Sequence, residues 1–405
     1  MWTVETAGSH RRLVEMIYFD AGGGHRASAT ALKAVAEQQG RQWRIRMTNL
    51  RDVLEPADFF RHLTGIRAED FYNAILKFDL TLGVAAMLPI MHLLIRRMHA
   101  RSVALLTRHF MAQPTDLVVS LIPHFNRALF DGLRKADANR NKRPTPMVTI
   151  MTDLADCPPH FWIERQEQFL ICGTVRAAQQ ALAMGLPSER VFQTSGMIVQ
   201  PAFYKAREMR RMDERRRLGL DPDLPCGLVM FGGYGSRRMV TIAERLAEDG
   251  PRVQLIFLCG HNQALREQLT GLKVPFPIIA QGFTRDVAYF MQLADFFVGK
   301  PGPGTITEAL VSGLPVIVAR NASTMPQERY NTEWILQKQV GIVIRSFSEI
   351  SKAVAMMIDK EEYRPFQMRI SALHNRAVFE IPEILDGIMM MAGESRARPV
   401  IHSLA

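Results

Sequence analysis

A glycine-rich segment in the last third of the chain has the residue types that bind a phosphate group. Phe296–Gly299 is apolar enough to form a buried strand, and the following Lys300-Pro301-Gly302-Pro303-Gly304 can only form a tight loop. Thr305 has the properties of a helix N-cap, and Glu308 follows at capping-box spacing, one turn inside the helix, where its carboxylate could reach a ribose diol. The unpaired N–H groups and partial positive charge of a helix start attract a phosphate. A glycine loop before a helix can also be no more than a tight turn, and the loop alone does not separate the two interpretations.

A histidine and an aspartate stand where they could carry out acid–base chemistry. His25 ends the glycine loop Asp20–His25, which follows an apolar strand at Val14–Phe19. Asp153 follows another apolar strand, at Met147–Met151. Functional groups of α/β proteins gather at the carboxyl ends of such strands. Imidazole can take a proton from a hydroxyl group near neutral pH, so His25 is the candidate base. Asp153 could orient its ring, bind the hydroxyl group, or only cap the following turn.

Two parts of the chain begin with the same order of elements, which is strand, glycine loop and helix. The first has a strand at Val14–Phe19 and a helix at Ala27–Gln39, and the second has a strand at Gly227–Phe231 and a helix from about Arg237. This repetition predicts an α/β protein with two Rossmann-like domains that face each other across a cleft. The first loop lacks the G-x-G-x-x-G spacing, and no acidic residue ends the next strand, Ile45–Leu50. A dinucleotide cofactor is therefore disfavoured.

Three strings of residues carry a resemblance to glycosyltransferase family 28. GPGTITEA at Gly302–Ala309, followed by GLPVIV and Pro326-Gln327-Glu328, resembles its donor-sugar-nucleotide signature. GGGHRASA from Gly22 and TDLADCPPHFW from Thr152 resemble its lipid-glycosylating members, such as monogalactosyldiacylglycerol synthase and the bacterial processive diacylglycerol glycosyltransferases. The resemblance runs from about residue 14 to residue 344 and is poor between residues 51 and 108, where the acceptor should bind.

The resemblance implies an α/β protein of the GT-B type and a UDP-sugar-dependent hexosyltransferase. Such an enzyme moves galactose or glucose from a UDP-sugar to the hydroxyl of diacylglycerol or of a glycosyl-diacylglycerol, with inversion, and the product is a membrane glycolipid. Backbone amides and a helix dipole can stabilise the departing diphosphate without a metal, so neither a metal nor a cofactor is expected. We expect an N-terminal acceptor and membrane-binding domain at residues 1–204, a basic linker at 205–226 and a nucleotide-sugar domain at 227–379, with a last helix at about 380–392 that packs back on the first domain.

The resemblance also assigns site residues. His25 and Asp153 are the expected catalytic pair. Glu308 would hold the ribose, and the sugar hydroxyls would contact Gln327, Glu328 and Asn331. The residues expected to bind the donor are Gly233, Ser236, Phe283, Gly302, Gly304, Thr305, Glu308, Gln327, Glu328 and Asn331. The residues expected to contact the acceptor or the membrane are Gly23, Gly24, His124, Trp162, Leu88, Ile90, Arg96 and Arg97.

An uncharged stretch in the first half has the composition of an interfacial membrane segment. Leu80–Ile95 contains no formal charge and is followed by Arg96, Arg97 and Arg101. It is shorter than the roughly 20 apolar residues of a spanning helix, and we expect Pro89 to break it. Two buried helices would explain the composition equally well, and only the resemblance to lipid glycosyltransferases favours the membrane. The basic run at 205–217 could add to the attraction to an anionic membrane surface.

The composition of the 405-residue chain limits the partners. Its net charge of +10 favours an anionic partner such as a phosphorylated substrate or an anionic membrane, and the chain has no nucleic-acid-binding motif. Its four cysteines form no C-x-x-C pair, so neither a zinc site nor a disulfide framework is expected. Asp221-Pro222-Asp223 has the metal-binding D-x-D pattern of another glycosyltransferase architecture, but it lies in a turn. With no signal peptide expected, we predict a peripheral protein on the cytoplasmic face of the bacterial inner membrane.

Three other functions stay open on these residues. The chain could transfer N-acetylglucosamine to a polyprenyl-pyrophosphate-linked acceptor. It could be a non-catalytic nucleotide-sugar-binding membrane protein. It could also be a metal-free sugar-nucleotide epimerase of the same architecture. The sequence names neither the sugar, the number of sugars added, the lipid acceptor nor the oligomeric state.

Overall fold

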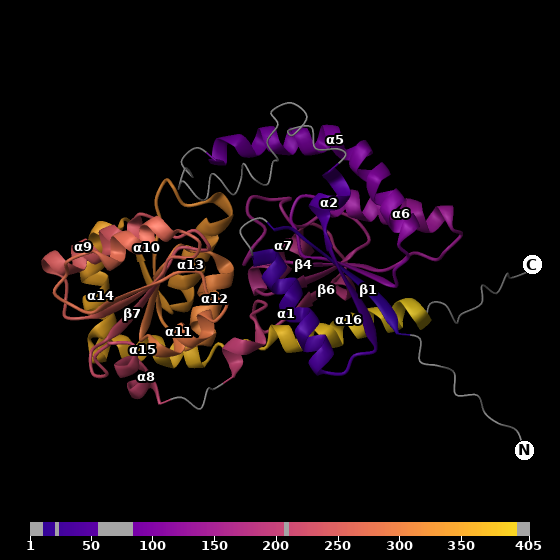
Figure 1. Cartoon of the computed structure of the whole chain (residues 1–405). Coiled ribbons are helices and arrows are strands. Elements are labelled where there is room, and N and C mark those ends of the chain that lie inside the picture. The colour runs from indigo at the N-terminus through magenta and orange to yellow at the C-terminus, as the bar shows by residue number, and fades with distance from the viewer. Residues whose placement is uncertain (1–10, 21–23, 56–83, 206–209, 395–405) are drawn as a thin grey trace, which may run out of the picture.

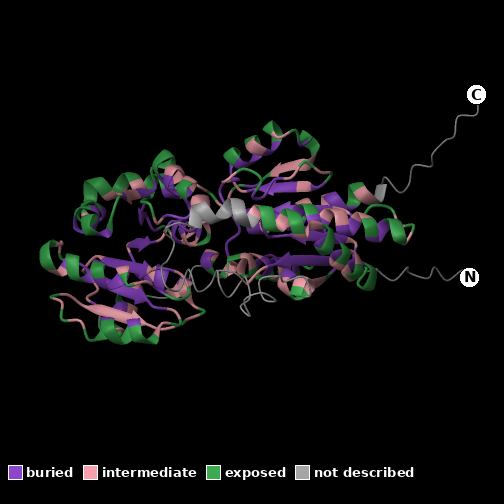
Figure 2. Ribbon diagram, turned by 90° about the horizontal axis from the view of Figure 1, so that it is seen from above, coloured by how far each residue is buried: buried purple, intermediate pink, exposed green. Residues whose placement is uncertain are grey.

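The computed structural model describes residues 11–20, 24–55, 84–205 and 210–394, without the side chains of residues 84–91 and 393–394. Within these ranges the strands form two parallel sheets of six strands each, which lie side by side in Figure 1. Helices pack on both faces of each sheet. Figure 2 shows the result, with most strands buried and the outer faces of the helices exposed.

The first sheet has the strand order β2-β1-β3-β4-β5-β6. Its strands are β1 (Arg12–Tyr18), β2 (Trp43–Asn49), β3 (Leu117–Ser120), β4 (Met147–Ile150), β5 (Phe169–Cys172) and β6 (Val191–Gln193). The helices of this half are α1 (Gly24–Gln38), α2 (Leu50–Leu54), α5 (Val84–Ala112), α6 (Asn126–Asn139) and α7 (Val175–Ala183), with 3₁₀ turns at Ser188–Arg190 and Pro201–Tyr204. The central strands β3 and β4 are buried along their whole length, as in a parallel sheet that is covered on both faces.

The second sheet has the order β12-β11-β10-β7-β8-β9, which from its other edge is the order of a doubly wound nucleotide-binding sheet. Its strands are β7 (Cys226–Met230), β8 (Gln254–Leu258), β9 (Ile278–Gln281), β10 (Phe296–Gly299), β11 (Val316–Ala319) and β12 (Gly341–Ile344). The helices that follow the first sheet are α8 (Arg211–Arg217), α9 (Arg238–Asp249), α10 (Gln263–Thr270), α11 (Val287–Leu293), α12 (Pro303–Val311), α13 (Pro326–Lys338), α14 (Ile350–Ile358), α15 (Lys360–Ser371) and α16 (Ala377–Glu394), with a 3₁₀ turn at Phe347–Glu349.

The strand order reverses at one place in each sheet. In the first sheet β1 lies between β2 and β3, and in the second sheet β7 lies between β8 and β10. Ligands of open α/β sheets bind outside the carboxyl ends of the strands at such a switch point. The loops after β1 and β3, and those after β7 and β10, are therefore the places where a site is expected.

The last helix, α16, packs on the first sheet, beside α1, and not on the sheet that precedes it in the chain (Figure 1). The buried residues that it adds to the core of the first half are Ala377, Val378, Ile381, Leu385, Ile388 and Met389. Its Asp386 also accepts hydrogen bonds of 2.7 Å from Arg41 Nη1 and Trp43 Nε1. The chain thus passes between the two halves twice, after β6 and before α16. The domain limits of 1–204, 205–226 and 227–379 stay a prediction.

Two helices begin earlier than the sequence suggested. Helix α12 has Gly302 as its N-cap and Pro303 as its first residue, so the prediction of Thr305 as N-cap is wrong. Proline suits the first helical position because it has no N–H to leave unpaired and its φ angle is already helical. Helix α1 begins at Gly24, so His25 lies in a first helical turn and not on the loop itself.

Helix α5 runs along the top of the first half in Figure 1. It continues from Val84 to Ala112 through Pro89, so the expected break at this proline is wrong. One proline costs a long helix a single backbone hydrogen bond and some strain, which the remaining turns can offset. The part of the uncharged stretch before residue 84 lies outside the described residues. No helix in the described ranges is long and apolar enough to cross a membrane.

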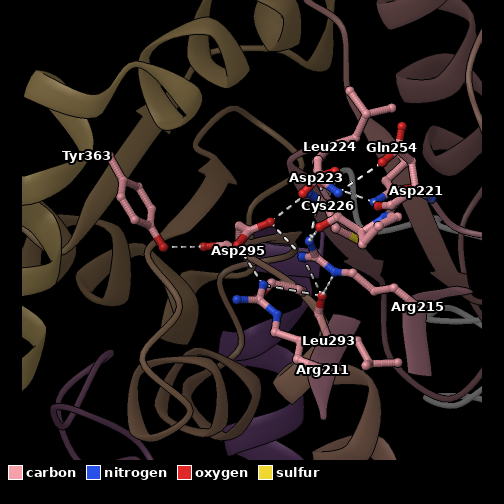
Figure 3. Close-up of polar contacts among 12 residues, drawn as sticks. Arg211, Arg215, Asp221, Asp223, Leu224, Cys226, Gln254, Leu293, Asp295 and Tyr363 are labelled. Carbon is pink, nitrogen blue, oxygen red and sulfur yellow. Dashed lines mark hydrogen bonds and ion pairs between the residues drawn. The ribbon is translucent and has the colours of Figure 1, made fainter. Parts of the chain in front are cut away.

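Two arginines of the basic run before the second sheet, Arg211 and Arg215, pair with one carboxylate inside the protein (Figure 3). The buried guanidinium of Arg215 donates to the carbonyl oxygen of Leu293 and pairs with Asp295 at 2.7 Å. Arg211 pairs with the same carboxylate. Arg216 and Arg217 pair with acidic residues of their own helix, α8. The idea that this run contacts an anionic membrane is therefore wrong for Arg211 and Arg215, because their charge anchors α8 to the end of α11.

Asp221 and Asp223, in the same region, lie in a turn, as the sequence predicted. The backbone N–H of Asp223 donates to Oδ1 of Asp221, and the N–H of Asp221 donates to Gln254 Oε1 (Figure 3). One of the two carboxylates is thus used to close the turn, as aspartate commonly does before proline-containing segments.

Candidate active site

The two glycine loops of the second sheet meet at its switch point, because β7 and β10 are adjacent strands. Lys300, the first residue after β10, lies across both loops. Its Cε is 3.8 Å from the point that a Cβ at Gly232 would occupy and 3.4 Å from the corresponding point at Gly302. A single side chain therefore spans the gap between the loops.

The start of helix α12 is open. No side chain in the described ranges caps it at Gly302. Gly304 is exposed, and a Cβ built on it would meet no atom within 4 Å. Thr305 follows and is half-buried. The first N–H groups of a helix have no partner within the helix, so this end can bind an anion.

The loop after β7 is held against the loop after β8. The N–H of His261 donates to the carbonyl oxygen of Gly233 at 2.8 Å. A Cβ at Gly260 would lie 2.0 Å from that oxygen, so only glycine permits the approach. Gly233 itself is exposed, with open space at the position of a Cβ. Ser236 is half-buried, and its Oγ accepts from the N–H of Arg238 at the start of α9.

Glu308 lies in the second turn of α12 and is half-buried. Burial raises the pKa of its carboxyl to about 7. Among the described residues its carboxylate has no hydrogen-bond or ion-pair partner. An ionised carboxylate can only accept hydrogen bonds, and the hydroxyl groups of a ligand are donors of that kind.

Three predicted sugar-binding residues lie on α13, and the structure gives them different positions. Glu328 is 8 % exposed, and its Oε1 lies 3.3 Å from Lys300 Nζ. Gln327 is half-buried and remains a candidate sugar contact. Asn331 is fully buried, and its Nδ2 donates to the carbonyl oxygen of Pro301 at 2.8 Å. The prediction that Asn331 contacts the sugar is therefore wrong for this conformation, because its amide donates to the glycine loop instead.

An exposed aromatic surface lies at the carboxyl end of the second sheet. Phe283, which is 54 % exposed, stacks on the ring of His261 with centroids 4.1 Å apart and planes 18° from parallel. The Tyr234 ring is tilted relative to the His261 ring, with centroids 6.0 Å apart. A flat, exposed ring of this kind can stack on a nucleobase.

On the first sheet, His25 lies at the switch point between β1 and β3. Its Nδ1 is 3.1 Å from Thr152 Oγ1, and the ring also bonds to the backbone carbonyl of Leu121. Burial lowers the pKa of His25 to about 4, with the Leu121 carbonyl opposing the shift. The imidazole is therefore uncharged at neutral pH, which is the form that can accept a proton.

Asp153 is buried and does not bond to His25. Its Oδ2 accepts a hydrogen bond of 2.8 Å from Trp162 Nε1. Burial raises the pKa of Asp153 to about 7; the Trp162 bond and Lys300 oppose the rise, and Glu328 adds to it. The prediction that Asp153 orients the His25 ring is wrong, because Thr152 occupies that place.

The electrostatic link from Asp153 to Lys300 and Glu328 joins the two halves. Asp153 follows β4 of the first sheet, whereas Lys300 and Glu328 belong to the second. Their charges act on Asp153 because the carboxyl ends of the two sheets face each other. The candidate base and the glycine loops therefore lie on opposite walls of one cleft.

Trp162 is 0 % exposed, so the prediction that it contacts the acceptor or the membrane is wrong for this conformation. Its side chain lies in the core of the first half, and its ring is 6.0 Å from that of His25. Asp156 shapes the turn around it, since its carboxylate accepts from the N–H groups of His160 and Trp162. The turn-capping role that the sequence left open for Asp153 thus belongs to Asp156.

His124 lies between the candidate base and helix α5. Its ring contacts Phe161, with centroids 3.9 Å apart, and lies 5.1 Å from the ring of His92 on α5. Its φ angle of 66° is in the left-handed region, and burial lowers its pKa to about 3. The acceptor contact of His124 stays a prediction.

The other predicted acceptor and membrane residues are distributed over two elements. Gly24 is the exposed first residue of α1, and Gly23 lies outside the described residues. Arg96 and Arg97 are exposed on α5, as are the apolar side chains of Leu93 and Leu94. The side chains predicted to enter a membrane and not described are Leu88 and Ile90.

A cavity of about 1340 Å³ also lies between the halves. It is bordered by Cys157 and Arg176 from the first half and by Val311 and Tyr330 from the second. None of the predicted donor residues lines it.

Sequence reasoning missed three residues that the structure brings into the site. Thr152 and Lys300 each stand directly beside a residue or loop that was assigned, so adjacency was the available signal. His261 follows β8 at a carboxyl end, which is a position that favours function. Its stacking on Phe283 joins two separate loops and had no local signal.

Comparison with known proteins decides the family of the second half. Residues 228–378 match the glycosyltransferase family 28 C-terminal domain. The second half of the chain is a glycosyltransferase family 28 C-terminal domain. The chain is also homologous to monogalactosyldiacylglycerol synthases over most of its length. It is 29 % identical over 397 residues to a probable chloroplastic synthase of Glycine max, covering 92 % of this chain and 71 % of the relative. It is 28 % identical to synthase 1 of Arabidopsis thaliana, covering 84 % of this chain and 64 % of the relative.

Solved structures of similar shape include glycosyltransferases and an epimerase. Acinetobacter baumannii MurG matches with a TM-score of 0.54 and 14 % identity, over 93 % of this chain and 99 % of its own. A putative UDP-N-acetylglucosamine 2-epimerase of Listeria monocytogenes matches with a TM-score of 0.57 and 16 % identity, over 95 % and 97 %. At such identities the likeness shows the fold alone, and that fold is GT-B. The expected two Rossmann-like domains across a cleft are confirmed.

Within the described ranges, no three His, Cys, Asp or Glu side chains are grouped as metal ligands. Transfer without a metal or a cofactor stays a prediction.

Proposed function

We propose that this family 28 glycosyltransferase moves galactose or glucose from a UDP-sugar to the hydroxyl of diacylglycerol or of a glycosyl-diacylglycerol. The observation that carries the proposal is the position of Glu308. Its carboxylate, which has no partner among the described residues, lies in the second turn of a helix whose start follows a glycine loop. That order of groups matches a ribose followed by a diphosphate. The names of the relatives, monogalactosyldiacylglycerol synthases, support the lipid acceptor.

In the proposed complex the second half holds the donor. The uracil ring of the donor stacks on Phe283, and Glu308 accepts hydrogen bonds from the ribose hydroxyls. The diphosphate lies at the start of α12, between the glycine loops. Gln327 and Glu328 face the sugar. Fixed N–H groups and a helix dipole favour the charge that develops on the departing diphosphate.

The first half binds the acceptor and supplies the catalytic base. The acceptor hydroxyl attacks the anomeric carbon, the bond from that carbon to the diphosphate oxygen breaks, and UDP leaves with the electron pair. His25 takes the proton of the hydroxyl, for which its uncharged imidazole is in the right state. A single displacement inverts the configuration, so an α-linked donor gives a β-linked glycolipid.

Association with the membrane would be peripheral. Helix α5 presents Leu93 and Leu94 together with Arg96 and Arg97 on its surface. Apolar and basic side chains on one helix suit the boundary of an anionic bilayer. We propose the cytoplasmic face of the bacterial inner membrane as this surface.

The experiment that tests the function offers the protein three radiolabelled donors, UDP-galactose, UDP-glucose and UDP-N-acetylglucosamine, with diacylglycerol vesicles or with a polyprenyl-pyrophosphate-linked sugar. We expect labelled hexose in the extracted diacylglycerol glycolipid. Label from UDP-N-acetylglucosamine in the polyprenyl fraction alone would favour the other acceptor class. Conversion of the donor without any lipid would favour an epimerase. No turnover together with tight UDP binding would favour a non-catalytic protein.

A further inference from the structure

The Lys300 side chain lies close to both glycine loops and to Glu328 of α13. Its aliphatic stem lies over Gly232 and Gly302, as the Cε positions above show. Its Nζ lies 3.3 Å from Glu328 Oε1. The side chain retains 35 % of its accessible surface, so it is not sealed into the core.

The surroundings of this ammonium are acidic and buried. Glu328 is its ion-pair partner, and the Lys300 charge also lowers the pKa of Asp153 on the opposite wall. Glu328 raises that same pKa. The charge of Lys300 thus acts on two carboxylates from different halves, and its side chain lies beside Gly302 at the start of α12, where the proposed donor diphosphate would lie.

We propose that Lys300 binds the diphosphate of the donor and stabilises the charge on the departing UDP. This inference rests on the proposed function and adds a residue to it. The helix start supplies only partial charges, whereas a nucleoside diphosphate carries at least two full negative charges. A lysine is a compact, mobile point charge suited to phosphate. When the anomeric carbon–oxygen bond breaks, the electron pair goes to the diphosphate oxygen, and the ammonium faces that oxygen without giving up its proton.

A purely structural role makes a different prediction. If Lys300 served only to hold Glu328, removing either partner of the ion pair would have the same effect on nucleotide binding. If Lys300 binds the diphosphate, the two substitutions have opposite signs. Loss of the ammonium weakens UDP binding, whereas Glu328→Gln releases the ammonium from its competitor and leaves UDP binding equal or tighter.

The test measures the affinities of UDP and uridine by calorimetry in the full chain. Lys300→Met keeps the stem that lies across the glycines and removes only the charge. We expect a loss of about 10- to 100-fold in UDP affinity, from the range found for hydrogen bonds to charged groups. Uridine affinity should stay unchanged, because uridine has no diphosphate. Lys300→Arg should recover part of the loss, and turnover of Lys300→Met at saturating donor should also fall.

Lys352→Gln is the matched control, since this lysine is exposed on α14 of the same half. It should bind UDP as the wild type does. The inference would be overturned, and the proposed function left intact, by either of two results. One is an equal loss of UDP affinity and uridine affinity in Lys300→Met, and the other is the same change in UDP affinity in Lys300→Met and Glu328→Gln. A wild-type protein that binds no UDP would overturn the proposed function itself, and the inference with it.

Discussion

Trp162 Nε1 donates a hydrogen bond of 2.8 Å to Oδ2 of Asp153, which is the residue of the first half that the charges of Lys300 and Glu328 reach across the cleft. The indole thereby fixes one carboxylate oxygen in the wall opposite the donor loops. His25 is left with Thr152 and the Leu121 carbonyl as its polar partners in the described structure. The two candidate acid–base groups are therefore held independently, and their contributions can be separated.

The pH dependence of turnover identifies the base. A base works only when it is deprotonated, so the rate should rise with pH through the pKa of the group. With His25 as base we expect the rise to be centred at about 4 in the free enzyme and a plateau at neutral pH. His25→Ala should lower kcat by about 10²–10⁴-fold and leave UDP affinity unchanged. A rise centred at about 7 that disappears in Asp153→Asn would assign the base to Asp153 instead.

The raised pKa of Asp153 should appear in the stability of the protein. Its pKa is 3.8 ordinarily and about 7 in the folded chain, so the folded state binds the proton more tightly than the unfolded state. The contribution of Asp153 to the free energy of unfolding is fully present below pH about 4 and is lost as the pH rises to about 7. Above that pH the free energy of unfolding no longer changes because of this group. The Asp153→Asn variant does not suffer this loss, so at pH 8 its free energy of unfolding should exceed that of the wild type by up to about 4 kcal/mol. Urea unfolding at pH 5 and pH 8 measures the difference, and an equal gain at both values would contradict the shift.

Glu308 should release a proton when the donor binds. Burial holds its pKa at about 7, and two hydroxyl donors favour the ionised form. Calorimetry of UDP binding at pH 6.5 in buffers of different ionisation enthalpy should therefore show proton release by the wild type and none by Glu308→Gln. Glu308→Ala should lower UDP affinity about 10- to 100-fold, with the smaller loss in Glu308→Gln. Unchanged affinity in both folded variants would mean that α12 does not face the nucleotide.

Membrane binding should depend on α5 and not on α8. Each exposed basic residue near an anionic surface contributes about 1 kcal/mol, so Arg96→Gln with Arg97→Gln should weaken binding to phosphatidylglycerol vesicles by about 30-fold at low salt. The matched control is Arg216→Gln with Arg217→Gln, because both arginines are exposed but paired within α8. Co-sedimentation at increasing salt measures both. A loss as large in the control pair would place the membrane contact elsewhere.

Local chemistry made much of the fold readable from the sequence. Runs such as Leu117–Ser120 have few alternatives to a buried strand, and the residues around Gly302 cannot continue either a strand or a helix. The order of strands, loops and helices therefore follows from short stretches. The start of α12 was misplaced because both Pro303 and Thr305 suit a helix start, and only the surroundings of the helix select between them.

The site was less readable because its decisive contacts join distant residues. Thr152 contacts His25 over a separation of 127 residues. Trp162 donates to Asp153, which therefore does not bond to His25. Arg215 looks like a surface charge in a basic run until Asp295, 80 residues later, buries it. No spacing in the sequence carries these pairings.

The attachment of α16 to the first sheet has a consequence for synthesis of the chain on the ribosome. The strands of the first sheet are complete by residue 193, but one face of its core waits for residues 377–389. At about 5–20 residues per second, the roughly 185 residues from the end of β6 to the start of α16 take roughly 10–40 s to translate. During that interval the nascent first half exposes the apolar face of its sheet beside α1. Helix α16 therefore completes the core of the first half late in synthesis, and the exposed apolar face is prone to aggregation until then.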